Sequence, residues 1–127
     1  MNVPADLRYS SDHEWAQSEA PDRVRVGITD YAQDALGDVV YVDLPAVGDR
    51  VELGTSFGEV ESTKSVSELY APLTGTVIEI NGDLTDDPQK LNEDPYGDGW
   101  ICVIAPDDPT QLDALLDAAA YGELIGG

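Results

Sequence analysis

The chain has 127 residues, 42% of them hydrophobic, which predicts a single domain over residues 1–127 with a hydrophobic core. Its 26 Asp and Glu residues outnumber six Lys and Arg residues, so the formal net charge is −20 at pH 7. Such a negative field repels phosphate groups, and we therefore expect neither nucleic acid nor a membrane surface among the partners. Residues 1–10 lack a basic region followed by an apolar run, and no apolar stretch approaches the roughly 20 residues that span a bilayer. We expect a cytoplasmic protein without a signal or transit peptide.

The first half of the chain predicts strands around one short helix. Polar and apolar residues alternate over residues 23–28, which indicates a half-buried strand. Thr29 or Asp30 is expected to cap a short helix near residues 30–36 that ends at Gly37. Further strands are predicted within residues 6–18, before a turn, and over residues 38–44.

The second half predicts many short strands separated by turns, a pattern typical of a sandwich or barrel. Residues 45–52 and 71–79 share an order of Pro, Gly, Val and Glu, so we expect two turn-and-strand units able to pair about a pseudo-twofold axis. Near the end, Pro109 and a stripe of apolar residues predict an amphipathic helix over residues 109–121, packed on the sheets. The stripe consists of Leu112, Leu115, Leu116 and Ala119.

The sequence offers little for a conventional active site. Its single His and single Cys, His13 and Cys102, lie far apart in the chain, and no glycine-rich phosphate loop is present. Cys102 lies in an apolar run, so we expect a buried small side chain. Residues 81–94 are acidic, but Pro88 stands where a calcium loop needs Gly, so a solvated loop is predicted. We predict no catalytic residues and no metal site.

Lys64, one of only two lysines, lies in an unusual setting. The segments on its two sides, "FGEVES" and "SVSELY", predict two strands with Thr63 and Lys64 at the turn between them. Nearby carboxylates keep an ammonium group charged, whereas a nucleophilic lysine must be neutral. A charged amine held on a rigid turn instead suits enzymatic attachment of a prosthetic group, although an exposed lysine without a role would look the same.

Four segments carry a resemblance to a known family. "GEVESTKSVSELYAPLTG", residues 58–75, resembles the attachment segment of lipoyl and biotinyl carrier domains. Biotin carriers usually have Met on both sides of the lysine, and here Thr63 and Ser65 stand there, so lipoyl attachment is the better match. Together with "SDHEW", "VGITDYAQDALGDVVYVDLPAVG" and "LNEDPYGDGW", the segment is similar to glycine cleavage system H proteins over nearly the whole chain.

This resemblance implies a fold and a cofactor. The fold would be mainly β, a barrel-sandwich hybrid of two antiparallel sheets, and residues 1–127 would form one lipoyl-carrier domain. Lys64 would carry (R)-lipoate as an amide, and Glu14 and Glu68 match positions that line the cleft receiving the arm. The dithiolane would perform the chemistry while the protein supplies position and electrostatics, so the chain would be a carrier and not an enzyme.

The resemblance also implies partners. The protein would accept an aminomethyl group from glycine decarboxylase (P protein) and present it to the aminomethyltransferase (T protein). Dihydrolipoyl dehydrogenase (L protein) would reoxidise it, and a lipoate ligase or octanoyltransferase would modify it; a monomer is expected. Three alternatives stay open: a lipoyl relay to 2-oxo acid dehydrogenase complexes, a biotin carrier, and an acidic binding module with an unmodified lysine.

Overall fold

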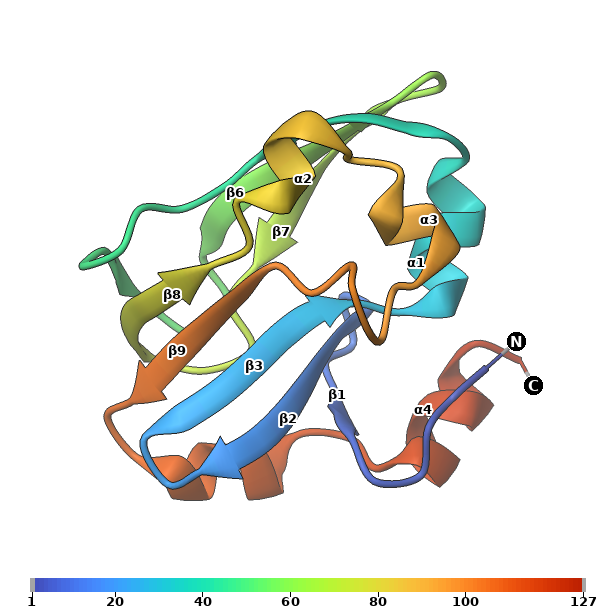
Figure 1. The fold of residues 1–127 in the computed structure, drawn as a ribbon. Coiled ribbons are helices and arrows are strands. Elements are labelled where there is room, and N and C mark those ends of the chain that lie inside the picture. The colour runs from blue at the N-terminus through green and yellow to red at the C-terminus, as the bar shows by residue number, and fades with distance from the viewer. Residues whose placement is uncertain (1, 127) are drawn as a thin grey trace.

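The protein, described here by a computed structural model over residues 2–126, is built from two antiparallel sheets (Figure 1). The larger sheet has six strands in the order β1-β2-β3-β9-β8-β5, and the smaller has three in the order β4-β6-β7. The strands are β1 (Arg8–Tyr9), β2 (Glu14–Ala20), β3 (Arg23–Ile28), β4 (Val39–Asp43), β5 (Arg50–Val51), β6 (Ser56–Ser62), β7 (Val66–Tyr70), β8 (Gly75–Ile80) and β9 (Cys102–Pro106). The predicted fold of two antiparallel sheets is confirmed; within residues 2–126 the sheets do not close into a barrel.

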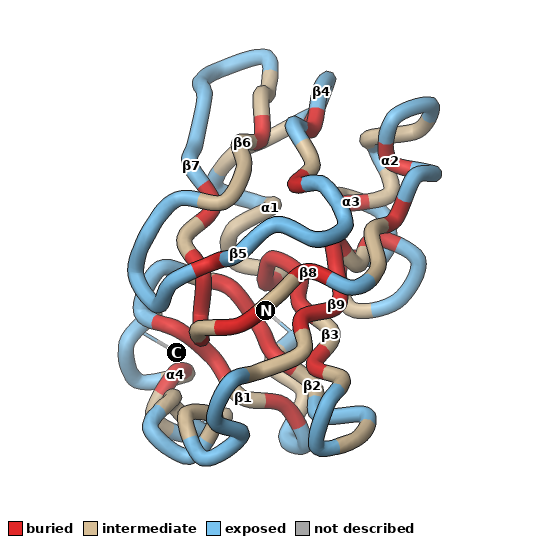
Figure 2. The backbone as a smooth tube through the Cα atoms, turned by 90° about the vertical axis from the view of Figure 1, so that its left-hand side faces the viewer, coloured by how far each residue is buried: buried red, intermediate tan, exposed pale blue. Residues whose placement is uncertain are grey.

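The main core lies between the sheets and follows from the alternation of the strands. In β3, Val24, Val26 and Ile28 are buried, whereas Arg23 and Arg25, which alternate with the two valines, are only partly buried. Figure 2 shows buried backbone through the middle of the molecule and exposed backbone at the far end of β6 and β7. Each fully buried aliphatic side chain contributes about 1.5–3 kcal/mol to folding. The small thiol side chain of Cys102 is also fully buried, as predicted.

The predicted short helix is confirmed as α1 (Asp30–Leu36). Thr29 caps its first turn, since its hydroxyl accepts from the backbone N–H of Ala32 at 3.1 Å. Gly37 ends the helix with φ at 78°, a left-handed conformation that a side chain disfavours.

The acidic segment 81–94 is not the solvated loop that its composition predicts. It contains two single-turn helices, α2 (Asp83–Asp86) and α3 (Lys90–Glu93). Leu84 and Leu91 are fully buried in the main core. The prediction was wrong because it weighed the surrounding carboxylates and overlooked these two apolar anchors.

The predicted continuous helix over residues 109–121 is also wrong. The chain instead forms a 3-10 helix, η1 (Pro109–Ala114), then a short extended stretch, then α4 (Ala118–Leu124). Leu116 leaves the helical path because its backbone N–H and C=O both bond to Tyr9, each at 2.8 Å. Asp117 then caps α4 by accepting from the N–H of Ala120 at 2.8 Å.

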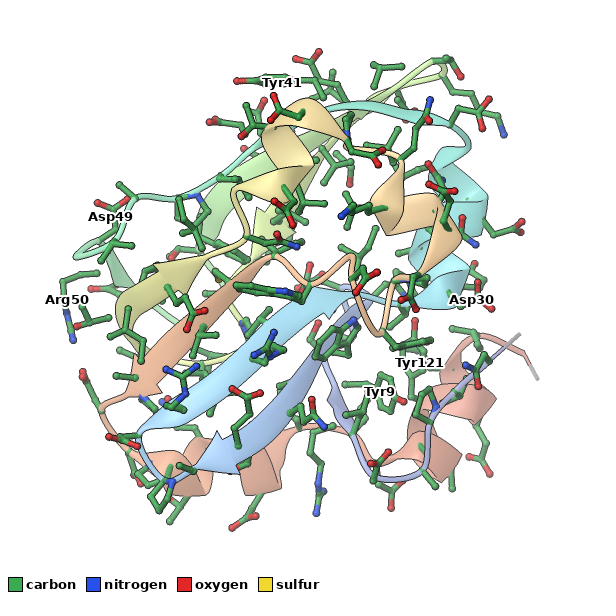
Figure 3. The ribbon with its side chains drawn as sticks, in the orientation of Figure 1. Tyr9, Asp30, Tyr41, Asp49, Arg50 and Tyr121 are labelled. Atoms are coloured by element: carbon green, nitrogen blue, oxygen red, sulfur yellow. The ribbon has the colours of Figure 1, made fainter. Side chains whose placement is uncertain are left out.

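The break divides the C-terminal segment between two hydrophobic clusters. Leu112 and Leu115 pack against the main core. Tyr121 of α4 joins a second cluster with Leu7, Tyr9 and Trp15, and its ring stacks on Tyr9 with centroids 4.6 Å apart (Figure 3). The C-terminal segment therefore packs against both hydrophobic clusters, in two pieces and not as one helix.

The two related sequence segments meet in the larger sheet. Arg50 pairs with Thr76 and Val51 pairs with Gly75, which joins β5 to β8 in antiparallel register. The predicted pairing of these segments is confirmed. No helix within residues 2–126 is both long and apolar enough to cross a membrane.

Candidate functional site

Lys64 lies at the tip of the β6–β7 hairpin, which projects at the upper right of Figure 1. Ser62 shapes the turn: its hydroxyl accepts from the N–H of Lys64 at 3.2 Å and from that of Ser65 at 3.1 Å. The backbone N–H of Ser62 donates to the carbonyl of Ser65 at 2.8 Å. The turn has no glycine and no left-handed residue, and the predicted hairpin with an exposed Lys64 is confirmed.

The second lysine is placed differently. Lys90 lies on α3, and its Nζ atom pairs with Asp83 at 3.6 Å. Lys64 belongs to no ion pair among residues 2–126. An exposed amine on a hairpin tip, without an ion-pair partner in that part of the chain, is the more accessible of the two to a modifying enzyme.

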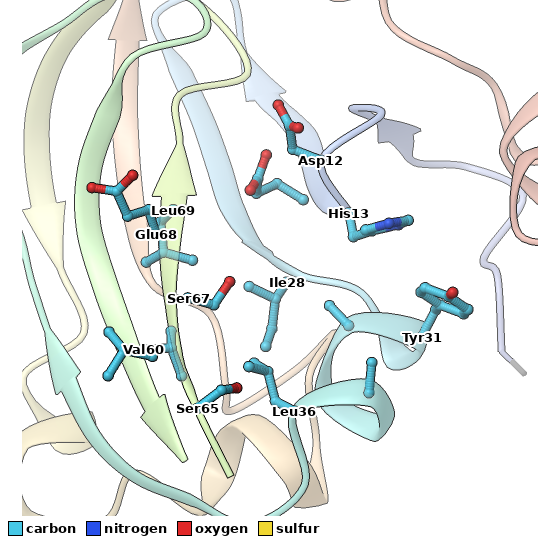
Figure 4. A pocket seen from close by; sticks show the side chains of 14 residues that line it. Asp12, His13, Ile28, Tyr31, Leu36, Val60, Ser65, Ser67, Glu68 and Leu69 are labelled. Carbon is cyan, nitrogen blue, oxygen red and sulfur yellow. The ribbon is translucent and has the colours of Figure 1, made fainter.

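A cleft of about 320 Å³ begins beside the hairpin tip and runs between β7, α1 and the turn before β2 (Figure 4). Ser65 and Val66 line it next to Lys64, and Asp12, His13 and Glu14 line it on the β2 side. Its other walls are largely apolar. They come from Ile28, Tyr31, Ala32, Ala35, Leu36, Val60, Ser67, Glu68 and Leu69.

Glu14 is a buried carboxylic acid on this cleft, with only 2% of its surface exposed. The hydroxyl of Ser10 donates to one of its oxygens at 2.6 Å, and the backbone N–H of Tyr70 donates to the other at 3.3 Å. Burial disfavours the charged form and raises the pKa of Glu14 to about 8, although both hydrogen bonds act against this rise. Glu14 thus joins the start of β2 to the free edge of β7.

Glu68 lies on the same cleft, but its carboxylate faces elsewhere. It accepts a hydrogen bond from the Tyr70 hydroxyl at 3.1 Å and pairs across the sheet with Glu59. Figure 4 shows its side chain on the side of β7 away from Ile28, whereas Ser67 points toward Ile28. The structure therefore places Glu14 in the cleft and leaves the Glu68 carboxylate at its outer rim, so the two acids do not meet.

His13 is a cleft residue that the sequence reasoning considered only as a nucleophile's partner. Its φ of 71° is the one positive value among the non-glycine residues of the described chain. Its Nδ1 atom lies 2.9 Å from the Tyr121 hydroxyl, and its ring lies 4.7 Å from that of Tyr31. Burial lowers the pKa of His13, which favours the neutral ring. The "SDHEW" segment, which contains His13, was among those that carry the family resemblance. No local sequence pattern, however, indicates that His13 contacts Tyr121.

The cleft suits an attached alkyl arm with a polar end. Its apolar walls match a hydrocarbon chain, and Glu14 and His13 supply polar groups away from the tip. The four residue steps from Lys64 to Glu68 cross the turn and the first part of β7 and span at most about 13 Å, close to the reach of about 12–15 Å for an extended lipoyl-lysine arm. No group of three or more His, Cys, Asp or Glu residues within residues 2–126 is arranged to hold a metal ion.

Relatives of the chain share nearly its whole length. The glycine cleavage H-protein family matches residues 7–126. The glycine cleavage system H protein of Anaeromyxobacter sp. (strain K) is 60% identical over 125 residues, covering 98% of this chain and 97% of that protein. The one from Myxococcus xanthus (strain DK1622) is 56% identical over 124 residues, covering 98% and 95%.

A solved structure agrees with the sequences. The crystal structure of a glycine cleavage system H protein from Mycobacterium marinum matches with a TM-score of 0.90 at 46% identity, covering 98% of this chain and 100% of that one. The family match, the sequence identities and the structural similarity each extend over nearly the whole chain. The chain belongs to the glycine cleavage H-protein family.

Proposed function

We propose that this protein is the lipoyl-carrying H protein of a glycine cleavage system and that Lys64 is its attachment site. Proteins of the family carry lipoate covalently on a lysine, and this chain has two. The observation that carries the assignment is the placement of Lys64 on an exposed, hydrogen-bonded turn at the mouth of a cleft, while Lys90 pairs with Asp83. The protein itself is a non-catalytic carrier.

Attached to Lys64, lipoate would supply a dithiolane able to carry the aminomethyl group of glycine, with the carboxyl group leaving as carbon dioxide and, after the methylene passes to the next enzyme, the nitrogen leaving as ammonia. The protein contributes a rigid base at Ser62, which fixes the turn, and a cleft that excludes water. Burial raises the pKa of Glu14 to about 8, so this side chain is mostly protonated near pH 7 while the cleft is empty. A cationic amine in the cleft would favour the ionised form of Glu14 and make a charge-assisted contact with it. Glu68 lies at the outer rim and would contact the arm only after turning inward.

The partners follow from membership in the glycine cleavage system: glycine decarboxylase, the aminomethyltransferase and dihydrolipoyl dehydrogenase. We propose in addition that a lipoate ligase or octanoyltransferase modifies Lys64 and that the carrier acts as a monomer. Amide formation removes one positive charge, so the modified protein has a formal charge of about −21.

The attachment site is tested by the intact mass of the protein purified from its native host, followed by peptide mapping. We expect one lipoyl group on Lys64 in the wild type and in Lys90→Arg, and none in Lys64→Arg. Lipoate on Lys90, or a Lys64 that stays unmodified, would contradict the assignment. A streptavidin blot of the same sample distinguishes a biotin carrier.

The role of Glu14 is tested by the lifetime of the aminomethyl cargo. A charge-assisted contact in a buried site is worth about 1.5–3 kcal/mol, and ionising a carboxyl group with a pKa of about 8 costs about 1.4 kcal/mol of this at pH 7. We therefore expect Glu14→Gln to shorten this lifetime several-fold, up to about tenfold. Glu68→Gln is the matched control, since it removes a carboxylate at the rim, and it should leave the lifetime unchanged. Equal lifetimes in wild type and Glu14→Gln would show that Glu14 does not protect the cargo.

A further inference from the structure

The hairpin tip that carries Lys64 rests on the segment that follows α1. The backbone N–H of Thr63 donates to the carbonyl of Asp38 at 3.1 Å. A Cβ atom placed on Gly37 would lie 3.3 Å from Cε and 3.6 Å from Cδ of Lys64, so the lysine side chain runs across this glycine. The tip is therefore held by Gly37 and Asp38 in addition to its own turn.

Asn92 of α3 fixes this supporting segment from another side. Its Nδ2 atom donates to the carbonyl of Gly37 at 2.8 Å, and its Oδ1 atom accepts from the N–H of Val39 at 2.9 Å. One side-chain amide thus binds the backbone on both sides of Asp38, whose carbonyl holds the hairpin tip. Nδ2 also donates to Gln33 of α1 at 3.1 Å.

The supporting segment also adjoins the mouth of the cleft. Ala35 and Leu36 line the cleft from the last turn of α1, and Gly37 follows them directly. Ser65 and Val66 line it from the hairpin side, directly after Lys64. The Lys64 side chain, which lies on Gly37, is therefore located between the α1 wall and the hairpin wall at the mouth of the cleft.

We propose that Asn92 is a positioning residue for the lipoyl arm. By holding the Gly37–Val39 segment, it keeps the hairpin tip against the backbone that follows α1 and directs the arm from Lys64 into the cleft. Without this support the tip would sample more orientations, and the arm would spend a smaller fraction of time in the cleft. The inference rests on the proposed function, since it requires that Lys64 carries the arm.

A matched pair of variants at Thr63 isolates the contact between the tip and Asp38. Thr63→Pro and Thr63→Ala both remove the threonine side chain, but only proline also removes the N–H that donates to Asp38. Proline is favoured at the second position of a β-turn, so we expect this substitution to be compatible with the turn from Ser62 to Ser65. Any difference between the two variants therefore reports on the lost hydrogen bond.

The first measurement uses the lipoylated protein loaded by glycine decarboxylase with glycine. Iodoacetamide alkylates the arm's remaining thiol whenever the arm is outside the cleft, and intact mass follows the rate. Cys102 does not interfere, because it is buried and its thiol pKa is raised to about 12. We expect alkylation about fivefold faster in Thr63→Pro than in Thr63→Ala, the effect of one hydrogen bond.

A second measurement on the unmodified protein needs no arm. Amide hydrogen exchange over residues 62–66 should be faster in Thr63→Pro and Asn92→Ala than in Thr63→Ala. Gln33→Ala is the control for Asn92, since it removes the Gln33 contact and leaves the bonds to Gly37 and Val39. We expect Asn92→Ala, but not Gln33→Ala, to raise the alkylation rate of the loaded arm.

Two results would contradict these proposals separately. Equal alkylation rates in Thr63→Pro and Thr63→Ala, with Lys64 lipoylated in both, would overturn the positioning role and leave the carrier function intact. Absence of lipoate from Lys64 of the wild type would overturn the proposed function, and the positioning role with it.

Discussion

Glu14 shows what burial does to a single carboxylate in a very acidic protein. The unfolded chain has a Glu pKa of 4.5, and burial in the fold raises the pKa of Glu14 to about 8. Between these values the folded protein holds a proton that the unfolded chain has released. The free energy of unfolding contributed by Glu14 is therefore fully present below pH 4.5 and is lost as the pH rises through 8.

Glu14→Gln should remove this pH dependence, because glutamine has no titrating proton. We expect the stability of the wild type relative to the variant to fall by about 2–4 kcal/mol between pH 5 and pH 8. Urea unfolding of both proteins at the two pH values measures this difference. Comparing how the two free energies of unfolding change with pH, and not their absolute values, cancels any effect of altered hydrogen bonds that is independent of pH. If both free energies change equally between pH 5 and pH 8, the pKa of Glu14 is not raised by folding.

Single residues also show where sequence reasoning succeeds. The exposure of Lys64 on a turn was predicted from the residues around the lysine, whereas the hydrogen bonds of Ser62 that shape this turn were found only in the structure. The placement of Asn92 was not, because its partners Gly37 and Val39 lie far away in the chain. Glu68, which the resemblance places at the cleft, does line it, and the alternation of β7 puts its carboxylate at the outer rim.

Among the helices and strands, those with a local signal in the sequence were predicted, and those that depend on distant contacts were missed. Strand β3 and helix α1 have clear local signals, an alternating pattern in one and a Thr cap with a terminal Gly in the other, and both were predicted. The break in the C-terminal segment was missed because it depends on backbone bonds between Leu116 and Tyr9. Helical propensity favours continuity there, and tertiary pairing overrides it.

Helix α4 is tied to the cleft through one hydroxyl group. The Tyr121 Oη atom lies 2.9 Å from His13 Nδ1 and 2.7 Å from Thr29 Oγ1. We expect Tyr121→Phe to destabilise the protein by about 1–3 kcal/mol, because it leaves polar groups of His13 and Thr29 without their partner. Tyr31→Phe is the matched control, since no side-chain hydrogen bond within residues 2–126 involves its hydroxyl. Urea unfolding that gives equal losses for the two variants would contradict this account.

The whole molecule is dominated by its negative charge. Ion pairs within residues 2–126 involve four of its six cationic side chains, Arg23, Arg25, Arg50 and Lys90. Most of the 26 acidic side chains therefore lack a cationic partner and repel one another. The paired residues are largely at the surface, where an ion pair contributes about 0–1 kcal/mol.

Salt should therefore stabilise this protein. Raising NaCl from 10 mM to 500 mM shortens the Debye length from about 30 Å to below 5 Å and screens the repulsion among carboxylates more than it weakens the few ion pairs. We expect the melting temperature at pH 7 to rise by about 3–8 °C, which calorimetry at both concentrations measures. Arg50→Gln is a useful companion variant, because it breaks the ion pair with Asp107 and makes the net charge more negative. The melting temperature of this variant should therefore rise more with salt than that of the wild type. A melting temperature that falls with salt would mean that the ion pairs outweigh the net repulsion.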